Sequence, residues 1–286
     1  MTISGENASK EGLVVYNYDL TDVQIEEILG DYFLGKEEQI QPFSLLVVSP
    51  EDSDSISNVA RTIECRVFRE RFSTNTPELM KDVYRPYEDS SSFVIIIDNV
   101  SNLPVGVMRL IENKPGSGMI SLDDVFLNPN INDGRGWGQE EVLIDDQKIR
   151  SADDLVRIGI NSLDIATIGI IKGYRRGDSE SRERISDYII LGLFYGLNVY
   201  SLDHDIGLWF AILDDNVLKY LESFGLYFDR YNGVQPKPYL GSPSSTPVFG
   251  EPYNLRQGFR AQHTKDGLYE LVVEGKGMDN IFNTIS

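Results

Sequence analysis

The chain has 286 residues, 41% of them hydrophobic and 25% charged, which is the composition of an ordinary globular protein with a core of its own. Its 45 Asp and Glu against 26 Lys and Arg give a formal net charge of −19. This balance argues against nucleic acid as the main partner, because a polyanion needs a broad basic face.

The cysteine content, the N-terminus and the apolar runs indicate where the protein works. Cys65 is the only cysteine, so no intrachain disulfide can form and a reducing compartment is favoured. Residues 1–12 are polar and lack the order of a signal peptide, and no stretch reaches ~18 consecutive apolar residues. We therefore expect a soluble, cytoplasmic protein without a membrane span. We expect no zinc site, because the chain has only two histidines and one cysteine as typical zinc ligands.

The first half of the chain alternates strands and helices. A short strand is predicted over 13–18, and Thr21 is a plausible N-cap for the helix that follows. A buried strand over 43–49 precedes a helix over 51–72. The apolar runs 92–98 and 104–112 flank a polar connection and predict a hairpin.

The second half begins with an irregular, Gly-, Asp- and Asn-rich block over 127–160, which we interpret as an insertion that covers or lines a cleft. A short helix is predicted inside it over 152–158. An apolar strand from 163 then enters a basic turn and a long helix that reaches 200. A strand over 207–213 and a helix over 214–224, stopped by Gly225, come next. The Pro-, Gly- and Ser-rich run 233–250 breaks the chain, and 268–274 is a candidate strand.

This order predicts an α/β fold in the broad sense, with a mixed α+β sheet flanked by helices. The expected organisation is an N-terminal extension over 1–42 and a main domain over 43–250 that contains the insertion 127–160. A C-terminal extension over 251–286 is expected to pack on the same domain.

The basic turn after residue 171 is a candidate anion site. Lys172, Arg175 and Arg176 stand just before the long helix, whose N-terminus offers free N–H groups and partial positive charge to a phosphate. A pyrophosphate or a phosphopantetheine arm would fit. The alternative is a solvated helix start in which Arg182 and Arg184 balance nearby carboxylates.

The order of these signals resembles the GNAT acyltransferase superfamily, and within it the acyl-homoserine-lactone and N-acyl amino acid synthases. Arg176-Gly177 is similar to the superfamily's phosphate turn. The branch is indicated by four segments in order, namely CRVFRER at 65–71, VGVMRL at 105–110, DVF at 124–126 and DIATIGI at 164–170. The resemblance spans roughly residues 43–232.

The resemblance implies a GNAT-like fold and transfer of an acyl group, expected to be fatty, to an amine such as an amino acid. The donor would be acyl-CoA or an acyl carrier protein, with no permanently bound cofactor. The residues implied in donor binding are Ile168, Gly169, Ile170, Ile171, Lys172, Arg175, Arg176, Gly177, Asp178 and Ser179.

Two residues are candidates for proton transfer. Asp164 stands where the family has a glutamate and is our candidate base, acting directly or through a water, with a cap on a turn as the alternative. On that basis Asp164→Asn should abolish turnover and spare donor binding. Leu221 occupies the place of the family's acid tyrosine, so the neighbouring Tyr220 is the candidate acid.

Four residues are candidates for substrate binding. Arg109 could hold a carboxylate of the acceptor or brace Asp164, or could face solvent from an edge strand. Thr167 replaces an arginine tied to homoserine-lactone synthesis, which points away from a lactone product. Phe126 and Trp209 could line an acyl tunnel, although buried strand aromatics are more often core.

Two other functions remain open. One is an acetyl-CoA-dependent acetyltransferase of a small molecule or protein, which a long apolar tunnel would argue against. The other is a GNAT-like module that binds without turnover. The absent second glycine of the phosphate turn and the displaced tyrosine keep this second alternative open.

Overall fold

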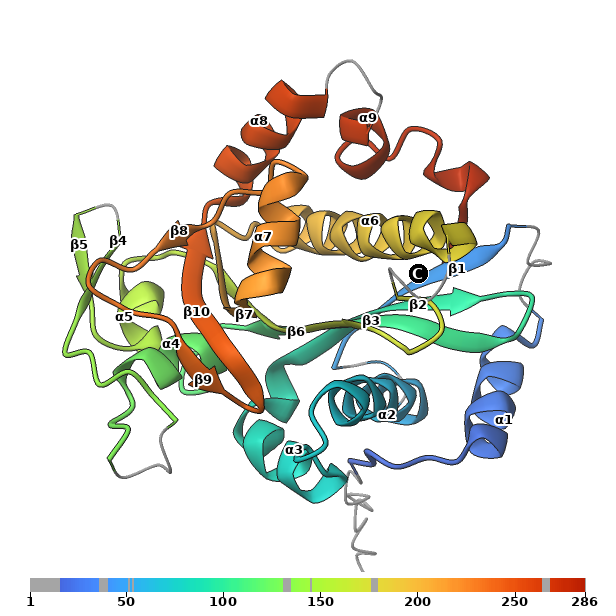
Figure 1. The fold of residues 1–286 in the computed structure, drawn as a ribbon, viewed down its shortest axis with the longest axis horizontal. Helices are drawn as coiled ribbons and strands as arrows, with labels where there is room; N and C mark the ends of the chain where they lie inside the picture. The colour runs from blue at the N-terminus through green and yellow to red at the C-terminus, as the bar shows by residue number, and fades with distance from the viewer. Residues whose placement is uncertain are drawn as a thin grey trace, which may run out of the picture.

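A mixed sheet forms the middle layer of the molecule, and helices cover both of its faces (Figure 1). The computed structural model describes residues 16–35, 41–50, 52, 54–130, 135–144, 146–175, 180–263 and 268–285. The strands of this sheet are β1 (Phe43–Val48), β2 (Ser91–Asp98), β3 (Leu103–Glu112), β6 (Ser162–Ile170), β7 (Leu208–Asp214), β8 (Asp229–Arg230), β9 (Lys237–Tyr239), β10 (Ser242–Gly250) and β11 (Phe282–Ile285).

The strand order is β11-β1-β2-β3-β6-β7-β10-β8, and β9 pairs with β10. The pairs β11–β1 and β6–β7 are parallel and the others are antiparallel. The segment predicted as a C-terminal extension thus contributes an edge strand beside the first strand. A separate hairpin, β4 (Val142–Ile144) with β5 (Gln147–Ile149), forms within the insertion.

The helices are α1 (Asp22–Phe33), α2 (Asp54–Arg71), α3 (Pro77–Tyr84), α4 (Ile120–Phe126), α5 (Ala152–Arg157), α6 (Glu180–Asp203), α7 (Asp215–Ser223), α8 (Pro252–His263) and α9 (Leu268–Val272), with 3-10 turns η1 (Arg85–Ser90) and η2 (Met278–Asn280). In Figure 1, α1, α2 and α3 lie below the sheet, and α6, α7, α8 and α9 lie above it. The predicted N-cap is confirmed, since Thr21 and Gln24 form a capping box at the start of α1.

Two cores lie on the two faces of the sheet. On β2, Phe93 and Ile95 pack towards α1 and α2, whereas Val94 and Ile96 pack towards α6. Because helices cover both faces, the strand is an uninterrupted apolar run instead of an alternating one. The predicted hairpin of the two strands β2 and β3 is confirmed.

The long helix α6 is the central helix of the upper layer. Its segment Ile185–Asp203 is the one stretch in the described residues that is long and apolar enough to cross a membrane, with a mean hydropathy of 1.2. Of that segment, 61% is buried, and α6 contacts β1, β2, β3 and β6. The weak membrane signal is therefore what a buried core helix produces.

Two segments that were expected to be strands are not strands in the described residues. Tyr16–Leu20 is irregular where part of a strand was expected, because its side chains bind other groups: the Tyr18 hydroxyl donates to Glu88. Residues 268–272 form helix α9, which packs on α6 and α8, and not a strand.

The run 233–250, expected to break the chain, instead contains β9 and β10. Proline removes a backbone donor and is tolerated in a sheet only where a donor is dispensable. Pro247 lies opposite Ile212 of β7, but the described pairs of β10 with β9 and β8, on its other edge, involve Ser242, Ser245, Val248 and Phe249 and leave out Pro243 and Pro247. The strand therefore forms around its prolines.

Candidate functional site

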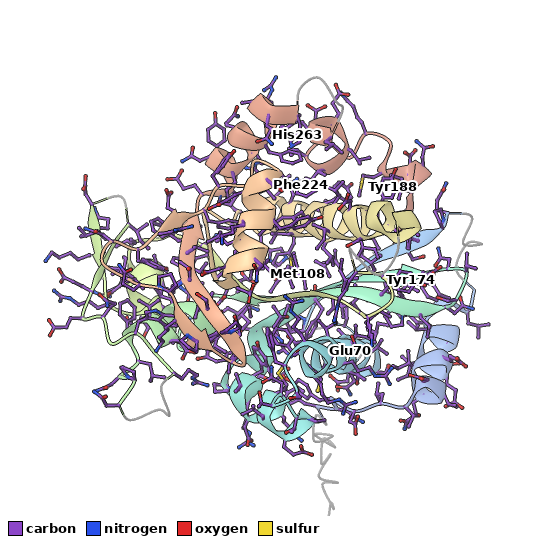
Figure 2. All side chains as sticks on the ribbon, viewed as in Figure 1. Glu70, Met108, Tyr174, Tyr188, Phe224 and His263 are labelled. Carbon is purple, nitrogen blue, oxygen red and sulfur yellow. The ribbon has the colours of Figure 1, made fainter. Side chains whose placement is uncertain are left out.

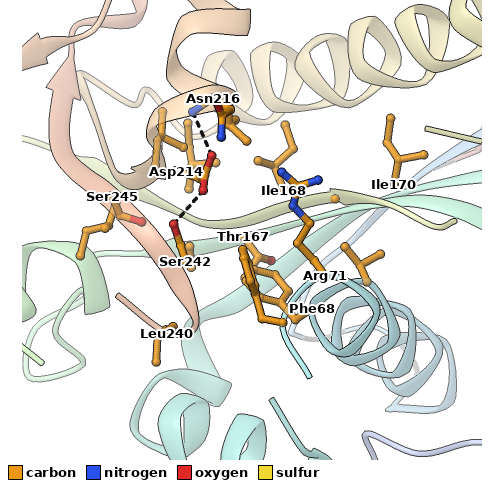
Figure 3. A pocket seen from close by; sticks show the side chains of 18 of the residues that line it. Phe68, Arg71, Thr167, Ile168, Ile170, Asp214, Asn216, Leu240, Ser242 and Ser245 are labelled. Carbon is orange, nitrogen blue, oxygen red and sulfur yellow. Dashed lines mark hydrogen bonds between the residues drawn. The ribbon is translucent and has the colours of Figure 1, made fainter. Parts of the chain in front are cut away.

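The parallel strands β6 and β7 separate part-way along their length. Their described backbone pairs run from Ser162–Leu208 to Asp164–Phe210 and end there. From that point a cavity of about 390 Å³ opens between the second half of β6 and the end of β7 (Figure 3). The other walls come from the end of α2, the end of α3, α6, α7 and the β9–β10 hairpin.

A β-bulge marks the start of the separation. Arg109 of β3 faces Thr167, but the next residue, Leu110, faces Ile165, so Ala166 is left over. A bulge bends its strand and increases its twist. β6 thus turns away from β7 beyond Asp164, and the backbone groups on that side of the strand face the cavity instead of a neighbouring strand.

The middle of the cavity is apolar, with Ile165, Ile168 and Val217 among its lining residues. Gly169 permits the close approach of α2 on the other side. A Cβ atom at Gly169 would lie 2.3 Å from Cγ1 of Val67, which is far inside van der Waals contact. The glycine therefore fixes how closely α2 and the cavity strand can pack.

Arg71 and Arg175 line one end of the cavity, and Lys172 adjoins it on the exposed turn after β6; we name these three cations the cationic end. Nε of Arg175 donates to the Ile170 carbonyl (2.7 Å) and Nη2 donates to Glu70 (2.8 Å). Glu70 also accepts the N–H of Lys172 (2.8 Å), whose side chain is exposed. Arg71 lines the cavity and makes no ion pair or hydrogen bond to a described residue. This end is preformed around Glu70 and keeps positive charge available.

The predicted donor-binding residues divide into three groups. Those that line the cavity are Ile168, Gly169, Ile170 and Arg175. Ile171 and Lys172 adjoin it, and the N–H of Ile171 donates to Val105. Arg176, Gly177, Asp178 and Ser179 lie outside the described residues, as do the side chains of Arg182 and Arg184.

The opposite end carries polar side chains from three elements, namely Tyr84, Asp214, Ser242 and Ser245, which we name the hydroxyl end. Asp214 is the N-cap of α7. Its carboxylate accepts the N–H of Asn216 (2.9 Å) and the hydroxyl of Ser242 (2.7 Å), as Figure 3 shows. The two bonds hold this carboxylate at the end of β7, beside the cavity.

A tight turn places Leu240 on the same wall. Leu240 and Gly241 have positive φ angles of 44° and 89° and form the two-residue connection between β9 and β10. A non-glycine residue in this region is uncommon and costs about 1–3 kcal/mol, a strain found often at ligand sites. The Leu240 carbonyl accepts the side-chain amide of Asn75 (3.1 Å), which helps to hold the turn.

Tyr220 lines the cavity from α7. Its hydroxyl donates to Asp187 of α6 (2.6 Å), and its ring packs edge-on against Phe224. The side chain is thus oriented by two neighbours and remains a candidate proton donor.

Asp164 is placed differently from the prediction. It is 0% exposed, does not line the cavity, and accepts both the N–H and the hydroxyl of Ser121 at 2.6 Å, which caps the start of α4. Burial raises the pKa of Asp164 to about 7, against the opposing effect of the Ser121 bonds. The capping alternative describes this position, and direct contact with a reacting amine does not.

Arg109 also differs from the prediction. It is 0% exposed and does not line the cavity; it donates to Glu64 (2.7 Å), Glu88 (3.3 Å) and Ser91 (3.0 Å), with no bond to Asp164 among the described contacts. Burial lowers its pKa, but the carboxylates of Glu64 and Glu88 outweigh burial and raise the value well above the ordinary range. Arg109 is thus the centre of a buried, charge-balanced cluster, where acceptor carboxylates cannot reach it.

Thr167 connects this cluster to the cavity. Its hydroxyl donates to Glu64 (2.6 Å) and accepts the N–H of Arg109 (3.3 Å), while the residue itself lines the cavity. The position expected to affect the choice of acceptor is therefore part of the wall.

Phe126 and Trp209 do not line this cavity. Trp209 is 3% exposed in the upper core, where its indole N–H donates to Ser201 (2.8 Å). Phe126 packs in the cluster around the insertion. Both residues are therefore core residues, the alternative given for them in the sequence analysis. The described residues of the insertion 127–160 also contribute nothing to the cavity wall.

Several wall residues were not singled out from the sequence. Arg71 is the last residue of the CRVFRER segment, and Asp214 is the first residue of the predicted helix 214–224. The sequence therefore offers a signal close to both residues. Tyr84, Ser242 and Ser245 gave no signal, because long-range folding alone brings α3 and β10 to the cavity.

Comparison with known proteins identifies the fold. No family model and no curated protein matches the chain. Among solved structures, FeeM, an N-acyl amino acid synthase from uncultured soil microbes, is 10% identical, covers 79% of this chain and 99% of its own, and gives a TM-score of 0.50. BjaI, a CoA-dependent acyl-homoserine lactone synthase solved with SAM and isopentyl-CoA, is 14% identical. The match covers 85% of this chain and 94% of BjaI, with a TM-score of 0.50.

The chain has a GNAT-type fold. The fold expected from the order of the sequence segments is thereby confirmed. In this fold the separated strands are β6 and β7, and the bulge at Ala166 stands at their point of separation.

Proposed function

We propose that this protein is an N-acyltransferase that moves a fatty acyl group from a pantetheine thioester to a small-molecule amine. The observation that carries the proposal is the separation of β6 from β7, with an apolar cavity that runs between a cationic end and a hydroxyl end. The similarity to a CoA-dependent synthase and to an N-acyl amino acid synthase supports the same chemistry.

The donor would lie along the open edge of β6. A pantetheine arm carries two amides, and these pair with backbone N–H and C=O groups as an added strand does. Its phosphate end would meet Arg71, Lys172 and Arg175 at the cationic end. The thioester would then sit in the apolar middle of the cavity, between Ile168 and Val217.

The reaction needs an oxyanion site, a proton acceptor and a proton donor. The backbone N–H groups of β6 that lie beyond the bulge and point away from β3 would stabilise the oxyanion, because β3 fixes the strand and β7 no longer pairs with it there. The amine nitrogen attacks the thioester carbon, the C–S bond breaks, and the leaving thiolate takes a proton. Tyr220 is positioned to supply that proton.

The apolar lining favours a fatty acyl group over acetyl. A short group would leave Ile190, Val217 and Leu221 facing water, whereas a hydrocarbon chain would cover them. Coenzyme A and an acyl carrier protein present the same pantetheine arm, so both belong to the proposed donor class.

Thiol release tests the proposal directly. The purified chain is offered acyl-CoA and acylated carrier proteins of two to sixteen carbons, with a mixture of amines. We expect release with long-chain donors, and about tenfold or greater loss in Ile190→Trp, which fills the apolar middle. Leu202→Trp, on an exposed position of the same helix, is the matched control. Thiol release from acetyl donors alone would contradict the fatty acyl donor and indicate an acetyltransferase. Binding of donors without thiol release would indicate a binding module without turnover.

A further inference from the structure

The insertion reaches the cavity through strand β9. Its described residues line no part of the cavity wall, whereas Tyr239 of β9 and Leu240 of the following turn both do. Figure 1 shows β9 beside helix α4, and a hydrogen bond joins the two. The segment 135–139 of the insertion lies against the same helix. Together α4 and this segment can position a wall that the insertion does not touch.

Three side chains connect these parts, and we name their interactions the α4–β9 contact. The Tyr239 hydroxyl donates to the Asp124 carboxylate of α4 (2.7 Å). The indole N–H of Trp137 donates to the Gln235 carbonyl, just before β9 (2.9 Å). Lys237 of β9 lies over the Trp137 ring, with Nζ 4.6 Å from the ring centroid. The rings of Trp137 and Tyr239 also pack, with their centroids 5.5 Å apart.

The carboxylate in this contact is buried, since Asp124 is 1% exposed. Its second oxygen pairs with Arg135 of the insertion (3.2 Å). Burial raises the pKa of Asp124, while Arg135 and the Tyr239 hydroxyl oppose that effect. A buried ion pair adds little net stability and is better suited to specifying one arrangement of its partners. Asp124 thus joins a residue of the insertion to a residue of the cavity wall.

The segment 135–139 is itself held firmly against α4. The N–H groups of residues 137–139 donate to two carbonyls of α4 and to that of Leu127, at 2.9 to 3.0 Å. Gly136 has a positive φ of 97°, and a Cβ atom there would overlap the Leu127 carbonyl oxygen, so only glycine fits. Trp137 packs on the apolar cluster around the insertion. The contact is therefore made from a fixed base.

Strand β9 depends on this base because it has little else to hold it. It is three residues long, and the register shifts between its two described pairs with β10, Tyr239–Ser242 and Lys237–Ser245. So short and irregular a strand has few backbone hydrogen bonds of its own. Beyond it, the Leu240 carbonyl accepts the side-chain amide of Asn75. The side chains of the α4–β9 contact supply the rest of the attachment.

We propose that Asp124 and Trp137 are positioning residues of the cavity, an inference that rests on the proposed acyl transfer. They hold β9, and with it Tyr239 and Leu240, where the wall meets a long acyl chain. Without them the wall moves and the chain loses apolar contacts. The phosphate end of the donor is unaffected, because no cation of the cationic end takes part in the contact.

Hydrogen–deuterium exchange of the whole chain tests the hold on β9. Trp137→Phe keeps a ring and loses the indole N–H, and Trp137→Ala loses both. Amides in 237–242 should exchange faster in both variants, more so in Trp137→Ala, with β1 unchanged. Leu143→Ala, at an exposed position of the same insertion, is the matched control and should match the wild type. Exchange in 237–242 as slow as in the wild type, or equally faster exchange throughout the sheet, would overturn the proposal.

Binding of two thioesters tests the effect on the acyl chain. S-decanoyl-pantetheine and S-acetyl-pantetheine carry the arm that both donors share, and the wild type should bind the decanoyl compound more tightly. Trp137→Ala should reduce that preference about fivefold, with the Kd of the acetyl compound unchanged. Tyr188→Phe, an exposed tyrosine of α6 outside the contact and the cavity, should match the wild type (Figure 2). An unchanged preference, or an equal loss for both compounds, would overturn the proposal.

A conservative pair of substitutions tests Asp124. Asp124→Asn retains an oxygen that accepts the Tyr239 hydroxyl, whereas Asp124→Ala does not. Asp124→Asn should therefore keep most of the preference for the decanoyl compound that Asp124→Ala loses. Equal losses in the two variants would contradict a role through the Tyr239 bond.

The failure of acyl transfer is distinguishable from the failure of this inference, because exchange requires neither donor nor turnover. A wild type that binds neither thioester, with faster exchange at 237–242 in the variants, would refute the proposed donor and keep the hold on the cavity wall. Thiol release with an unchanged chain preference in every variant would refute the positioning role and keep the enzyme.

Discussion

The two halves of β6 differ in what their polar groups bind. In the first half the strand pairs with β3 and β7, and its carboxylate Asp164 is bonded twice to Ser121. In the second half β7 has diverged, and the cavity beside it holds the unpaired cation of Arg71 and the unpaired hydroxyl of Tyr84 among the described residues. A polar group that is bonded within the protein and sealed away from the cavity serves the fold, whereas one on the cavity wall can meet a ligand.

The largest predicted effect lies in the satisfied region. Glu64→Ala leaves the buried Arg109 guanidinium without its main partner and should cost about 3–5 kcal/mol of unfolding free energy. Urea unfolding measures the loss. Arg85→Ala removes the exposed pair with Asp82 and should cost under about 0.5 kcal/mol. A Glu64→Ala loss as small as that of the surface control would mean that the cluster is not a structural unit.

The second prediction concerns pH. Burial raises the pKa of Asp164 to about 7 in the folded protein, so between the ordinary aspartate pKa, near 4, and this value the folded state holds a proton that the unfolded state has lost. Stability should therefore fall as pH rises from about 4 to about 7, by at most about 1.4 kcal/mol per pH unit, and level off above. Asp164→Asn should lack this slope. Denaturation curves at pH 5 and pH 8 measure it, and parallel profiles for both proteins would contradict it.

The same variant separates the two halves of β6 functionally. Because Asp164 is sealed away from the cavity, Asp164→Asn should retain acyl transfer, contrary to the expectation from sequence. Tyr220→Phe, on the cavity wall, should lower kcat at least tenfold. The reverse ranking of the two variants would restore Asp164 as the base.

The third prediction concerns the contact between α2 and the open half. Gly169→Ala places a methyl group against Val67 and should cost about 1–3 kcal/mol by overpacking. The double variant Gly169→Ala with Val67→Ala should recover part of the loss, because it removes the atoms that clash. Chemical denaturation of the three proteins measures the coupling, and strictly additive losses would contradict the contact.

The smallest effect is expected at the cationic end. Arg71→Gln should raise the KM for the acyl donor about fivefold, which corresponds to about 1 kcal/mol. The difference in KM from the wild type should shrink at high salt, because an ion pair between the exposed Arg71 and a donor phosphate is screened. Arg69→Gln, exposed on the same helix and outside the cavity wall, is the control. Equal effects of the two substitutions would indicate that only the overall charge of this surface matters and that Arg71 does not contact the donor phosphate.

Local patterns were enough to predict the elements that make up the open half of the sheet. The apolar strand with Asp164, the hairpin before it and the helix after Asp214 follow from short-range signals, and their order indicated the GNAT-type fold. Pattern reasoning failed where distant contacts decide. Prolines hid β10, and an arginine in an apolar strand did not reveal that Glu64 and Glu88 enclose it.

The site shows the same division. Gly169 and Arg175 were predicted as donor residues and line the cavity, because the strand and the turn that hold them are contiguous in sequence. Asp164 and Arg109 were predicted as functional because charges are rare in apolar strands, yet their partners satisfy them. Sequence shows that a charge is buried but not what faces it.

The most direct test of the account is hydrogen–deuterium exchange of the wild type with and without saturating long-chain acyl-CoA or acylated carrier protein. If a pantetheine arm pairs with the open edge of β6, amides in 165–170 should become protected, and those of β1, on the far side of the sheet, should not change. Unaltered exchange in 165–170 at saturating donor would contradict the account.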